Sequence, residues 1–244
     1  MSAEERFLRR RVIVAQPEDG FRSGLDAVML AAAIPAKAGN EVLELGAGAG
    51  TASLCLAWRV PDCAVTGVEI DEALVDLANR NAAANEFEAR THFVRADVLA
   101  LPREMKRDFA HVFCNPPFHH AEGDSSPDAA RSRALMDAGR LRDWLRTGLK
   151  RTASGGTFTA ILRADRLGEA LANLPERGVA VFPLWPRADS PAKRIIVQVR
   201  KGSNHPLALL PGLVLHEDDG RSTAAADAIL REGAALLVAE GRAL

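Results

Sequence analysis

The sequence predicts an α/β fold built on a mostly parallel sheet with helices on both faces. Short apolar, β-branched runs alternate with segments of helical periodicity, which is typical of consecutive βαβ units. The chain has 244 residues, 48% of them hydrophobic, so it can bury one large core. No linker or internal repeat divides it. We therefore expect one domain over residues 1–244, with an N-terminal hairpin and helix in residues 1–40 and a C-terminal extension in residues 203–244.

The N-terminal segment is expected to form a hairpin and then a helix. Arg11–Gln16 has the β-branched character of a short strand, and Pro17–Gly20 is a turn signal. Phe21–Arg22 is the expected start of the return strand. A helix is expected from about residue 24 to residue 34, with the Ser23 hydroxyl capping its first free N–H groups.

Beyond this segment we expect seven core strands that alternate with helices, and a last helix beyond the sheet. The strands are expected at Glu41–Leu45, Ala64–Ile70, Thr91–Ala96, Phe109–Cys114, Gly156–Leu162, Val179–Leu184 and Arg194–Arg200. The helices are expected at Thr51–Val60, Glu72–Asn85, Leu141–Lys150, Arg166–Asn173 and Thr223–Val238.

A glycine-rich loop follows the first core strand, at the edge where open α/β sheets bind ligands. Glycine there lets the chain turn sharply and lets a ligand approach the main chain. A dinucleotide fold would place the third glycine one position later. The spacing found here, with an acidic residue two positions before the first glycine, resembles motif I of the class I S-adenosylmethionine methyltransferases. The resemblance implies a Rossmann-like methyltransferase fold and cofactor contacts from Glu44, Gly46, Ala47, Gly48 and Gly50.

Two further acidic positions follow the next two strands. Glu69 ends the second strand, where its carboxylate can accept from both ribose hydroxyls of a nucleoside. Dinucleotide enzymes use a similar device, so Glu69 alone does not discriminate. Asp97 is placed to accept from an adenine amino group, with Val98 and Ile70 lining the ring. A helix cap or a loop carboxylate is the alternative role for Asp97.

The tetrapeptide Asn115-Pro116-Pro117-Phe118 follows the fourth strand. It resembles the Asn-Pro-Pro-aromatic motif of methyltransferases that act on a planar nitrogen, such as a nucleobase amine or a glutamine amide. That nitrogen is a poor nucleophile, so the site must align it, accept from its N–H groups and stack its planar group. The Asn115 side-chain oxygen and the Pro116 carbonyl are the expected acceptors, Pro117 offers no competing N–H, and Phe118 supplies the stacking face. A proline-rich turn without a chemical role is the alternative.

Composition limits the partners and the compartment. The net charge of −1 gives no global field toward nucleic acid. The three cysteines lack metal-ligand spacing, so we expect no metal site and reduced, mostly buried thiols in a cytoplasmic protein. No membrane association is expected, because the apolar run over residues 27–34 is far below the roughly 20 residues that span a bilayer.

Positive charge is nevertheless concentrated in three clusters, which either bind phosphates or form solvated faces. The clusters are Arg6, Arg9, Arg10 and Arg11; Arg131, Arg133, Arg140, Arg142, Arg146, Lys150 and Arg151; and Lys193, Arg194, Arg200 and Lys201.

From about residue 20 to residue 220 the chain resembles the bacterial tRNA(Val) (adenine-N6)-methyltransferases. The likeness rests on the motifs above, on the stretch from Phe21 to Leu30 and on parts of the tail. It implies tRNA as the partner, an adenine amino group as the acceptor, and Ser23 and Asp26 near the methionine end of the cofactor. Many relatives have tyrosine at Phe118, a change that preserves stacking. A glutamine amide or small-molecule acceptor is the alternative, a non-catalytic binding module is a more distant one, and the oligomeric state is left open.

Overall fold

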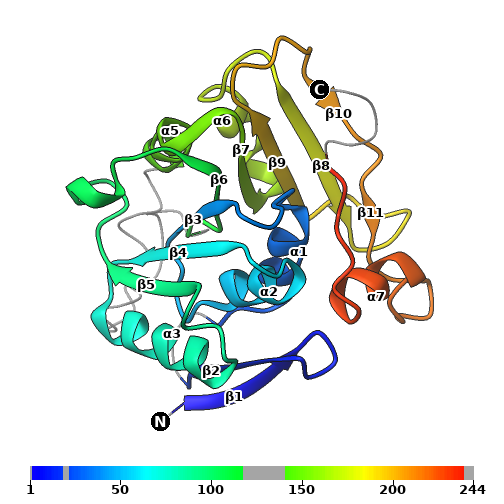
Figure 1. Cartoon of the computed structure of the whole chain (residues 1–244). Coiled ribbons are helices and arrows are strands. Elements are labelled where there is room, and N and C mark those ends of the chain that lie inside the picture. The colour runs from blue at the N-terminus through cyan, green and yellow to red at the C-terminus, as the bar shows by residue number, and fades with distance from the viewer. Residues whose placement is uncertain (1, 19–21, 118–140, 239–244) are drawn as a thin grey trace, which may run out of the picture.

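The computed structural model describes residues 2–18, 22–117 and 141–238. Its centre is a nine-stranded sheet, and a separate two-stranded hairpin lies at the N-terminus (Figure 1). The strands of the sheet are β3 (Glu41–Leu45), β4 (Ala64–Glu69), β5 (Thr91–Arg95), β6 (Phe109–Cys114), β7 (Thr152–Arg163), β8 (Val179–Trp185), β9 (Arg194–Arg200), β10 (Ala208–Leu209) and β11 (Leu213–Val214). Their order is β10-β8-β9-β7-β6-β3-β4-β5, and β11 also pairs with β8.

The predicted α/β class and all seven predicted core strands are confirmed. Strands β3 to β7 run parallel, whereas β9 is antiparallel to both β7 and β8. The carboxyl ends of the parallel strands therefore share one edge of the sheet, which we call the carboxyl edge. The first residue of β9 also lies there, because Arg194 pairs with Arg163. The two extra strands, β10 and β11, have only two residues each, too few for a periodic pattern.

Helices cover both faces of the sheet, and consecutive strand residues face opposite sides. In β3, Val42 belongs to the apolar cluster beneath α1, α2 and α3, whereas Leu43 belongs to the cluster beneath α5 and α6. The core is therefore two apolar layers with the sheet between them. The helices are α1 (Leu25–Ala33), α2 (Thr51–Arg59), α3 (Glu72–Ala84), α5 (Leu141–Arg151), α6 (Leu167–Leu171) and α7 (Ala224–Leu230).

The N-terminal hairpin is present, but its pairing differs from the prediction. Strand β2 (Val12–Pro17) pairs with the preceding β1 (Ser2–Phe7), and Arg22, the described part of the expected return strand, is not in a strand. Three consecutive residues from Leu8 to Arg10 have positive φ and form the turn. Such a run in residues other than glycine is disfavoured, which is why no turn signal marked it. Phe21 lies outside the described residues.

The Ser23 side chain does not cap α1, contrary to the prediction. Gly24 occupies the N-cap position, with no side-chain hydrogen bond. The main chain of Ser23 is instead held by the buried amide of Gln16, which accepts from Ser23 N at 2.6 Å and donates to Ser23 O at 2.9 Å. This pair of bonds ties the end of β2 to the start of α1.

Asn81 of α3 and Asn85, which follows the last residue of that helix, hold the free side of β2. The Asn85 amide accepts from Ile13 N at 2.9 Å and donates to Ile13 O at 2.6 Å. One helical turn earlier, Asn81 makes the same two bonds with Ala15, each at 2.9 Å. Asn81 also donates to the carbonyl of Ala49 at 3.0 Å. The hairpin is therefore linked through α3 to the glycine-rich loop.

The C-terminal helix is much shorter than predicted. It begins after Thr223, whose hydroxyl accepts from Ala226 N at 3.1 Å, and α7 ends at Leu230. The chain then turns at Gly233, which has φ of +70°, and Leu236 N donates to Ala32 O at 2.8 Å. Docking along α1 thus replaces the rest of the expected helix. No helix in the described part of the chain is long and apolar enough to cross a membrane.

Candidate active site

The register of the sheet brings the glycine-rich loop beside the Asn115 segment. Leu45 pairs with Cys114 on one side and with Val68 on the other. The next residues along these three parallel strands, Gly46, Asn115 and Glu69, are therefore neighbours on the carboxyl edge. The loop is fixed there because Gly46 N and Ala47 N both donate to Val68 O, at 2.8 and 3.0 Å.

The three glycines of the loop have positive φ but different surroundings. A Cβ on Gly46 would lie 2.5 Å from Cη2 of Trp144, and one on Gly50 would lie 2.6 Å from Cζ of Phe93. A Cβ on Gly48, where φ is +56°, would meet no atom within 4 Å. Gly46 and Gly50 are thus needed for packing inside the protein. Gly48 borders open space, as expected where a ligand lies against the main chain.

Glu44 is buried beneath the loop, with only 3% of its surface exposed. Its Oε2 accepts from the Ser53 hydroxyl and from Ser53 N in the first turn of α2. Burial raises the pKa of the Glu44 carboxyl to about 8, and the nearby Glu69 adds to the rise. No hydrogen bond to Oε1 is found within the described residues. Glu44 therefore holds the protein side of the loop and keeps one oxygen without a donor.

Glu69 is held rigidly at the tip of β4. Its Oε1 accepts from Ile70 N at 2.8 Å and Asp71 N at 3.1 Å, and its Oε2 accepts from Gly48 N at 3.0 Å. The bond to Gly48 ties this strand tip to the glycine-rich loop. Beside it the Ile70 side chain is 45% exposed, one of the few large apolar side chains on the surface. A fixed carboxylate next to an exposed apolar surface suits a nucleoside, whose ribose is polar and whose base is flat.

Asp97 and Val98 follow β5 on the same edge. Asp97 is exposed, and its Oδ1 accepts from Leu99 N at 2.8 Å in a local turn. Val98 is 7% exposed and packs in the same apolar cluster as Trp144. Asp97 thus has the loop role that we weighed against adenine binding, and its exposed carboxylate keeps further acceptor capacity.

The Asn115–Pro117 segment leaves the end of β6 with its polar groups poorly matched inside the protein. Asn115 Oδ1 is buried, and no donor for it is found among the described residues. A buried acceptor without a partner costs roughly 1–3 kcal/mol, so an unpaired one calls for a partner from outside. Pro116 is buried and Pro117 half-buried. Phe118 lies outside the described residues.

The start of α1 reaches the carboxyl edge through an ion pair. Asp26 Oδ2 accepts from Arg194 Nε at 2.8 Å, although 168 residues separate them. This pair joins the first turn of α1 to the first residue of β9. Ser23 lies three residues before Asp26, in the segment held by Gln16. The region predicted to lie near the methionine end is thus anchored to the sheet.

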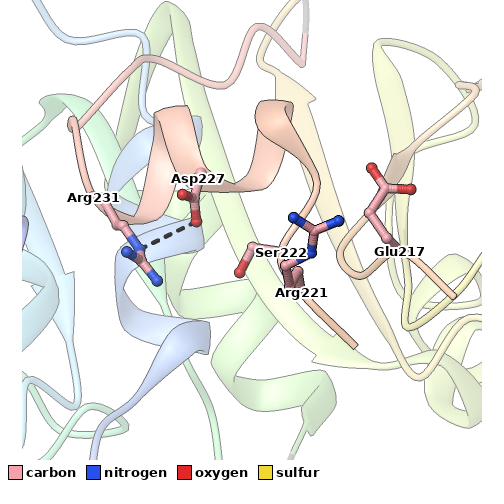
Figure 2. A pocket seen from close by; sticks show the side chains of 5 residues that line it. All are labelled: Glu217, Arg221, Ser222, Asp227 and Arg231. Carbon is pink, nitrogen blue, oxygen red and sulfur yellow. Dashed lines mark ion pairs between the residues drawn. The ribbon is translucent and has the colours of Figure 1, made fainter. Parts of the chain in front are cut away.

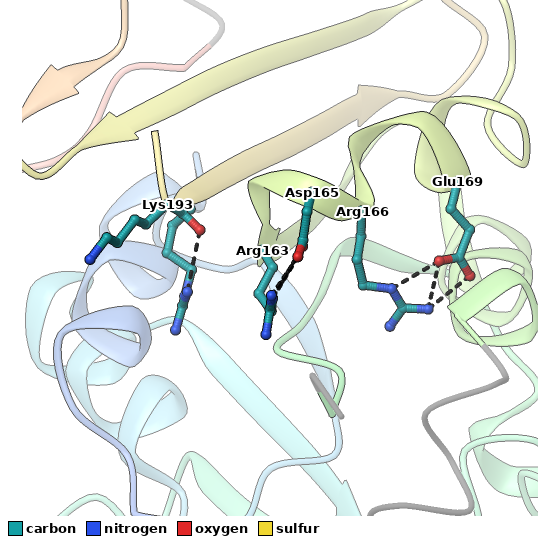
Figure 3. Close-up of polar contacts among 6 residues, drawn as sticks. Arg163, Asp165, Arg166, Glu169 and Lys193 are labelled. Carbon is teal, nitrogen blue, oxygen red and sulfur yellow. Dashed lines mark hydrogen bonds and ion pairs between the residues drawn. The ribbon is translucent and has the colours of Figure 1, made fainter. Parts of the chain in front are cut away.

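More charged residues line the carboxyl edge around β7 and β9 (Figure 3). Arg163 pairs with Asp165, and Arg166, which is only 6% exposed, pairs with Glu169 at 2.7 Å. Lys193 belongs to the third predicted basic cluster, and β9 splits that cluster. Its Lys193–Arg194 part lies on the carboxyl edge, and its Arg200–Lys201 part lies at the other end of the strand, on the opposite edge.

Sequence reasoning missed several residues that build this site. Trp144 packs on Gly46, Ser53 holds Glu44, and Asn81 bonds the loop carbonyl of Ala49. Each looks in the sequence like an ordinary helix residue. Only Ser53, a hydroxyl in the first turn of a helix, carried a recognisable signal.

Two surface hollows lie away from this site. One is beside α7 and is lined by the Asp227–Arg231 ion pair, at 3.2 Å, and by Glu217, Arg221 and Ser222 (Figure 2). Its acidic and basic side chains balance one another. The other lies on the opposite edge, near Arg200. Within the described residues, no group of three or more His, Cys, Asp and Glu side chains could hold a metal ion, and the three cysteines are free and buried.

Comparison with known proteins now indicates the enzyme class. A family model described as the methyltransferase small domain matches residues 23–141. A crystal structure of a predicted O-methyltransferase from Agrobacterium tumefaciens superposes with a TM-score of 0.73, at 28% identity, covering 87% of this chain and 98% of that one. The chain is an S-adenosylmethionine-dependent methyltransferase.

Curated relatives of this methyltransferase carry a common name, tRNA1(Val) (adenine(37)-N6)-methyltransferase. One from Yersinia enterocolitica is 29% identical over 69% of this chain and 67% of its own length. Another, from Dickeya chrysanthemi, is 26% identical over 93% of this chain and 92% of its own. The comparisons also decide between the two interpretations of the glycine-rich loop, in favour of S-adenosylmethionine over a dinucleotide.

The carboxyl edge of the methyltransferase fits this cofactor. S-adenosylmethionine is cationic at its methionine end, carries two ribose hydroxyls and ends in a flat adenine. The edge offers the open space at Gly48, the carboxylates of Glu44, Glu69 and Asp97, and the exposed apolar side chain of Ile70. Carboxylates can accept from the hydroxyl and amino donors and favour the positive charge.

Proposed function

We propose that this methyltransferase methylates the exocyclic amino group (N6) of an adenine in tRNA. The names of the relatives support tRNA and adenine as the acceptor. The observation that carries the proposal is Asn115 Oδ1, which is buried beside the glycine-rich loop and has no donor among the described residues. This oxygen can accept a hydrogen bond, and the amino group of an adenine has an N–H that can donate it. A tRNA substrate also implies a cytoplasmic enzyme.

In this proposal the Asn115–Phe118 segment orients the acceptor. Asn115 Oδ1 and the Pro116 carbonyl accept from the two N–H groups of the adenine amine, and Phe118 stacks on the base. Positive charge develops on the nitrogen during transfer, and these fixed acceptors stabilise it without reorganising. Pro117 lacks an N–H that would compete for them. S-adenosylmethionine, when bound, supplies the electrophilic methyl group.

The proposed cofactor residues are those that the sequence motifs single out. Gly46, Ala47, Gly48 and Gly50 would shape the loop beneath the ligand, Glu69 would accept from the ribose hydroxyls, and Asp97 from the adenine amine with Ile70 and Val98 beside the ring. Glu44 would favour the positive charge through Oε1, because a bound cation lowers the pKa of a nearby carboxyl and so ionises it. Ser23, Asp26 and Asn115 would border the methionine end.

The alternative acceptor is a protein glutamine amide or a small molecule. The amide would use the same two acceptors, because it is also planar and carries two N–H groups. The Agrobacterium neighbour is described as acting on oxygen, but a hydroxyl donates only one hydrogen bond. The two proposed acceptors, Asn115 Oδ1 and the Pro116 carbonyl, therefore favour an amino or amide nitrogen.

The test uses radiolabelled S-adenosylmethionine with total RNA and total protein from a strain that lacks this gene. We expect label in N6-methyladenosine of the tRNA fraction. Label only in protein would move the acceptor to an amide.

The Asn115→Ala variant tests the site itself. We expect it to lose at least a hundredfold in the rate of transfer, because a fixed acceptor is lost at the reacting nitrogen. Its affinity for S-adenosylhomocysteine, measured by calorimetry, should stay within a few-fold of the wild type. Wild-type transfer by this variant would contradict the proposed role of Asn115.

A further inference from the structure

The outer face of α5 carries a row of basic side chains. Arg142, Arg146 and Lys150 are four residues apart and all exposed, whereas Leu141, Trp144 and Leu145 face the core. Residues four apart advance about 6 Å along a helix and lie on nearly the same side. The hydrogen bond and ion pair of Arg142 go to its neighbour Asp143. No ion pair of Arg146 or Lys150 is found within the described residues.

The two ends of α5 lie at two functionally different places. Near its start, Trp144 packs against Gly46 of the glycine-rich loop, so this end is at the candidate active site. Near its end, Leu149 lines a surface hollow on the opposite edge of the sheet. The basic row of α5 therefore leads away from the active site towards that hollow.

The hollow beside Leu149 is also lined by basic side chains, so it extends the basic row of α5. Arg177, Arg200 and Lys201 line it together with one acidic residue, Glu176. These three cations donate to main-chain carbonyls, Arg177 to Asn204 O at 2.8 Å, Arg200 to Gly155 O at 3.2 Å and Lys201 to Thr152 O at 2.6 Å. In the described part of the chain, none of them forms an ion pair. Their charge is therefore not neutralised within the protein.

The other predicted basic clusters are different in this respect. In the hairpin, Arg9 and Arg11 pair with Glu232, and Arg11 lies over Trp58 at 5.1 Å. On the carboxyl edge, Arg163 pairs with Asp165 and Arg194 with Asp26. Those cations serve internal contacts. Arg177 belongs to none of the predicted clusters. The other cations of α5 and the hollow come from two clusters that are distant in the sequence and adjacent in the fold.

We propose that α5 and the hollow form a track that binds the phosphate backbone of RNA. The basic track consists of Arg142, Arg146, Lys150, Arg177, Arg200 and Lys201. All of these cations except Arg142 lack an ion pair within the described residues, and the three on α5 are regularly spaced. This arrangement suits a chain of phosphates, which cations bind by displacing counterions and without reading sequence. The track starts at the glycine-rich loop, so it would hold the RNA that continues from the adenine in the active site. This inference rests on the proposed RNA substrate.

The test compares two double variants that each remove two positive charges. Arg146→Gln with Lys150→Gln removes the middle of the track. Arg10→Gln with Arg80→Gln is the matched control, because both residues are exposed and lie away from α5 and the hollow. Arg10 is in the turn of the hairpin, and Arg80 is on α3, on the other face of the sheet. The full-length proteins are titrated with bulk tRNA at several salt concentrations.

We expect the track variant to bind tRNA about tenfold more weakly and the control to match the wild type. The slope of log K against log salt should fall by roughly 1.4 to 1.8 in the track variant, since two phosphate contacts are lost. Arg177→Gln, in the hollow, should lower the slope by roughly 0.7 to 0.9. Affinity for S-adenosylhomocysteine should not change, because none of these side chains lies at the glycine-rich loop.

Equal losses in the track variant and the control would overturn the track. If Arg177→Gln alone left the affinity for tRNA and its salt dependence unchanged, the hollow would not be part of the basic track. The substrate proposal fails separately, when the wild type transfers no methyl group to RNA. In that case, a selective loss of tRNA affinity in the track variant would still support RNA binding by the basic track.

Discussion

At the scale of single residues, Glu44 has the most perturbed chemistry of the carboxylates in the structure. Its pKa is raised to about 8 by burial, from an ordinary value near 4.5. The folded protein therefore binds a proton that the unfolded chain has released between these two values. The contribution of Glu44 to the free energy of unfolding is therefore fully present below pH 4.5 and is lost as the pH rises through 8.

Glu44→Gln should remove this pH dependence. A glutamine oxygen still accepts from Ser53, but it cannot ionise. The variant should match the wild type near pH 5 and exceed its stability at pH 9, by at most about 5 kcal/mol. Urea denaturation at both pH values measures the difference. A constant difference across this range would contradict a protonated Glu44.

Alanine substitutions at Gly48 and Gly46 should affect different properties, cofactor binding at Gly48 and stability at Gly46. Alanine at Gly48 would adopt a left-handed conformation at a cost of about 1–2 kcal/mol and place its Cβ in open space. Alanine at Gly46 would in addition collide with Trp144, which adds about 1–3 kcal/mol.

We therefore expect Gly48→Ala to fold and to bind S-adenosylhomocysteine at least tenfold more weakly, because its methyl group occupies ligand space. Gly46→Ala should show the larger fall in the free energy of unfolding. Denaturation curves and calorimetry measure the two effects. Unchanged affinity in Gly48→Ala would place the ligand elsewhere.

At the scale of elements, the hairpin and the glycine-rich loop are joined through α3. Asn81 and Asn85 make the same pair of bonds to β2, and only Asn81 extends to Ala49. Asn81→Ala and Asn85→Ala should each lower the free energy of unfolding by about 1–3 kcal/mol. Asn81→Ala alone should also raise the Kd for S-adenosylhomocysteine several-fold, as calorimetry would show. Equal Kd values in the two variants would mean that the Ala49 bond does not shape the loop.

Patterns of neighbouring residues in the sequence predicted the core strands and the glycine-rich loop correctly. All seven core strands and the loop from Glu44 to Gly50 were found where periodicity and glycine spacing placed them. The pairing of β2 with β1 was missed, since its turn uses three residues other than glycine with positive φ. The length of α7 was overestimated because Ala-rich sequence favours helix, whereas contact with α1 ends it.

At the scale of the whole molecule, the motifs predicted the edge of the sheet that holds the site but not its supports. Glu69 and Asn115 were recognised from their positions after strands. The Asp26–Arg194 pair joins residues 168 apart in the sequence, and no local pattern announces such a contact. The sequence also did not predict the direction of β9. That direction places the two parts of one predicted basic cluster at opposite edges of the sheet.

The pairing of β10 and β11 with β8 has a consequence for solubility. A full-length strand at the side of a sheet presents a row of free N–H and C=O groups, which can template pairing with another chain. Here β10 covers Ala180 and Val181, and β11 covers Leu184 and Trp185. The C-terminal extension therefore pairs with most of the outer side of β8 and leaves only two-residue strands at that border, which are short templates for pairing with another chain.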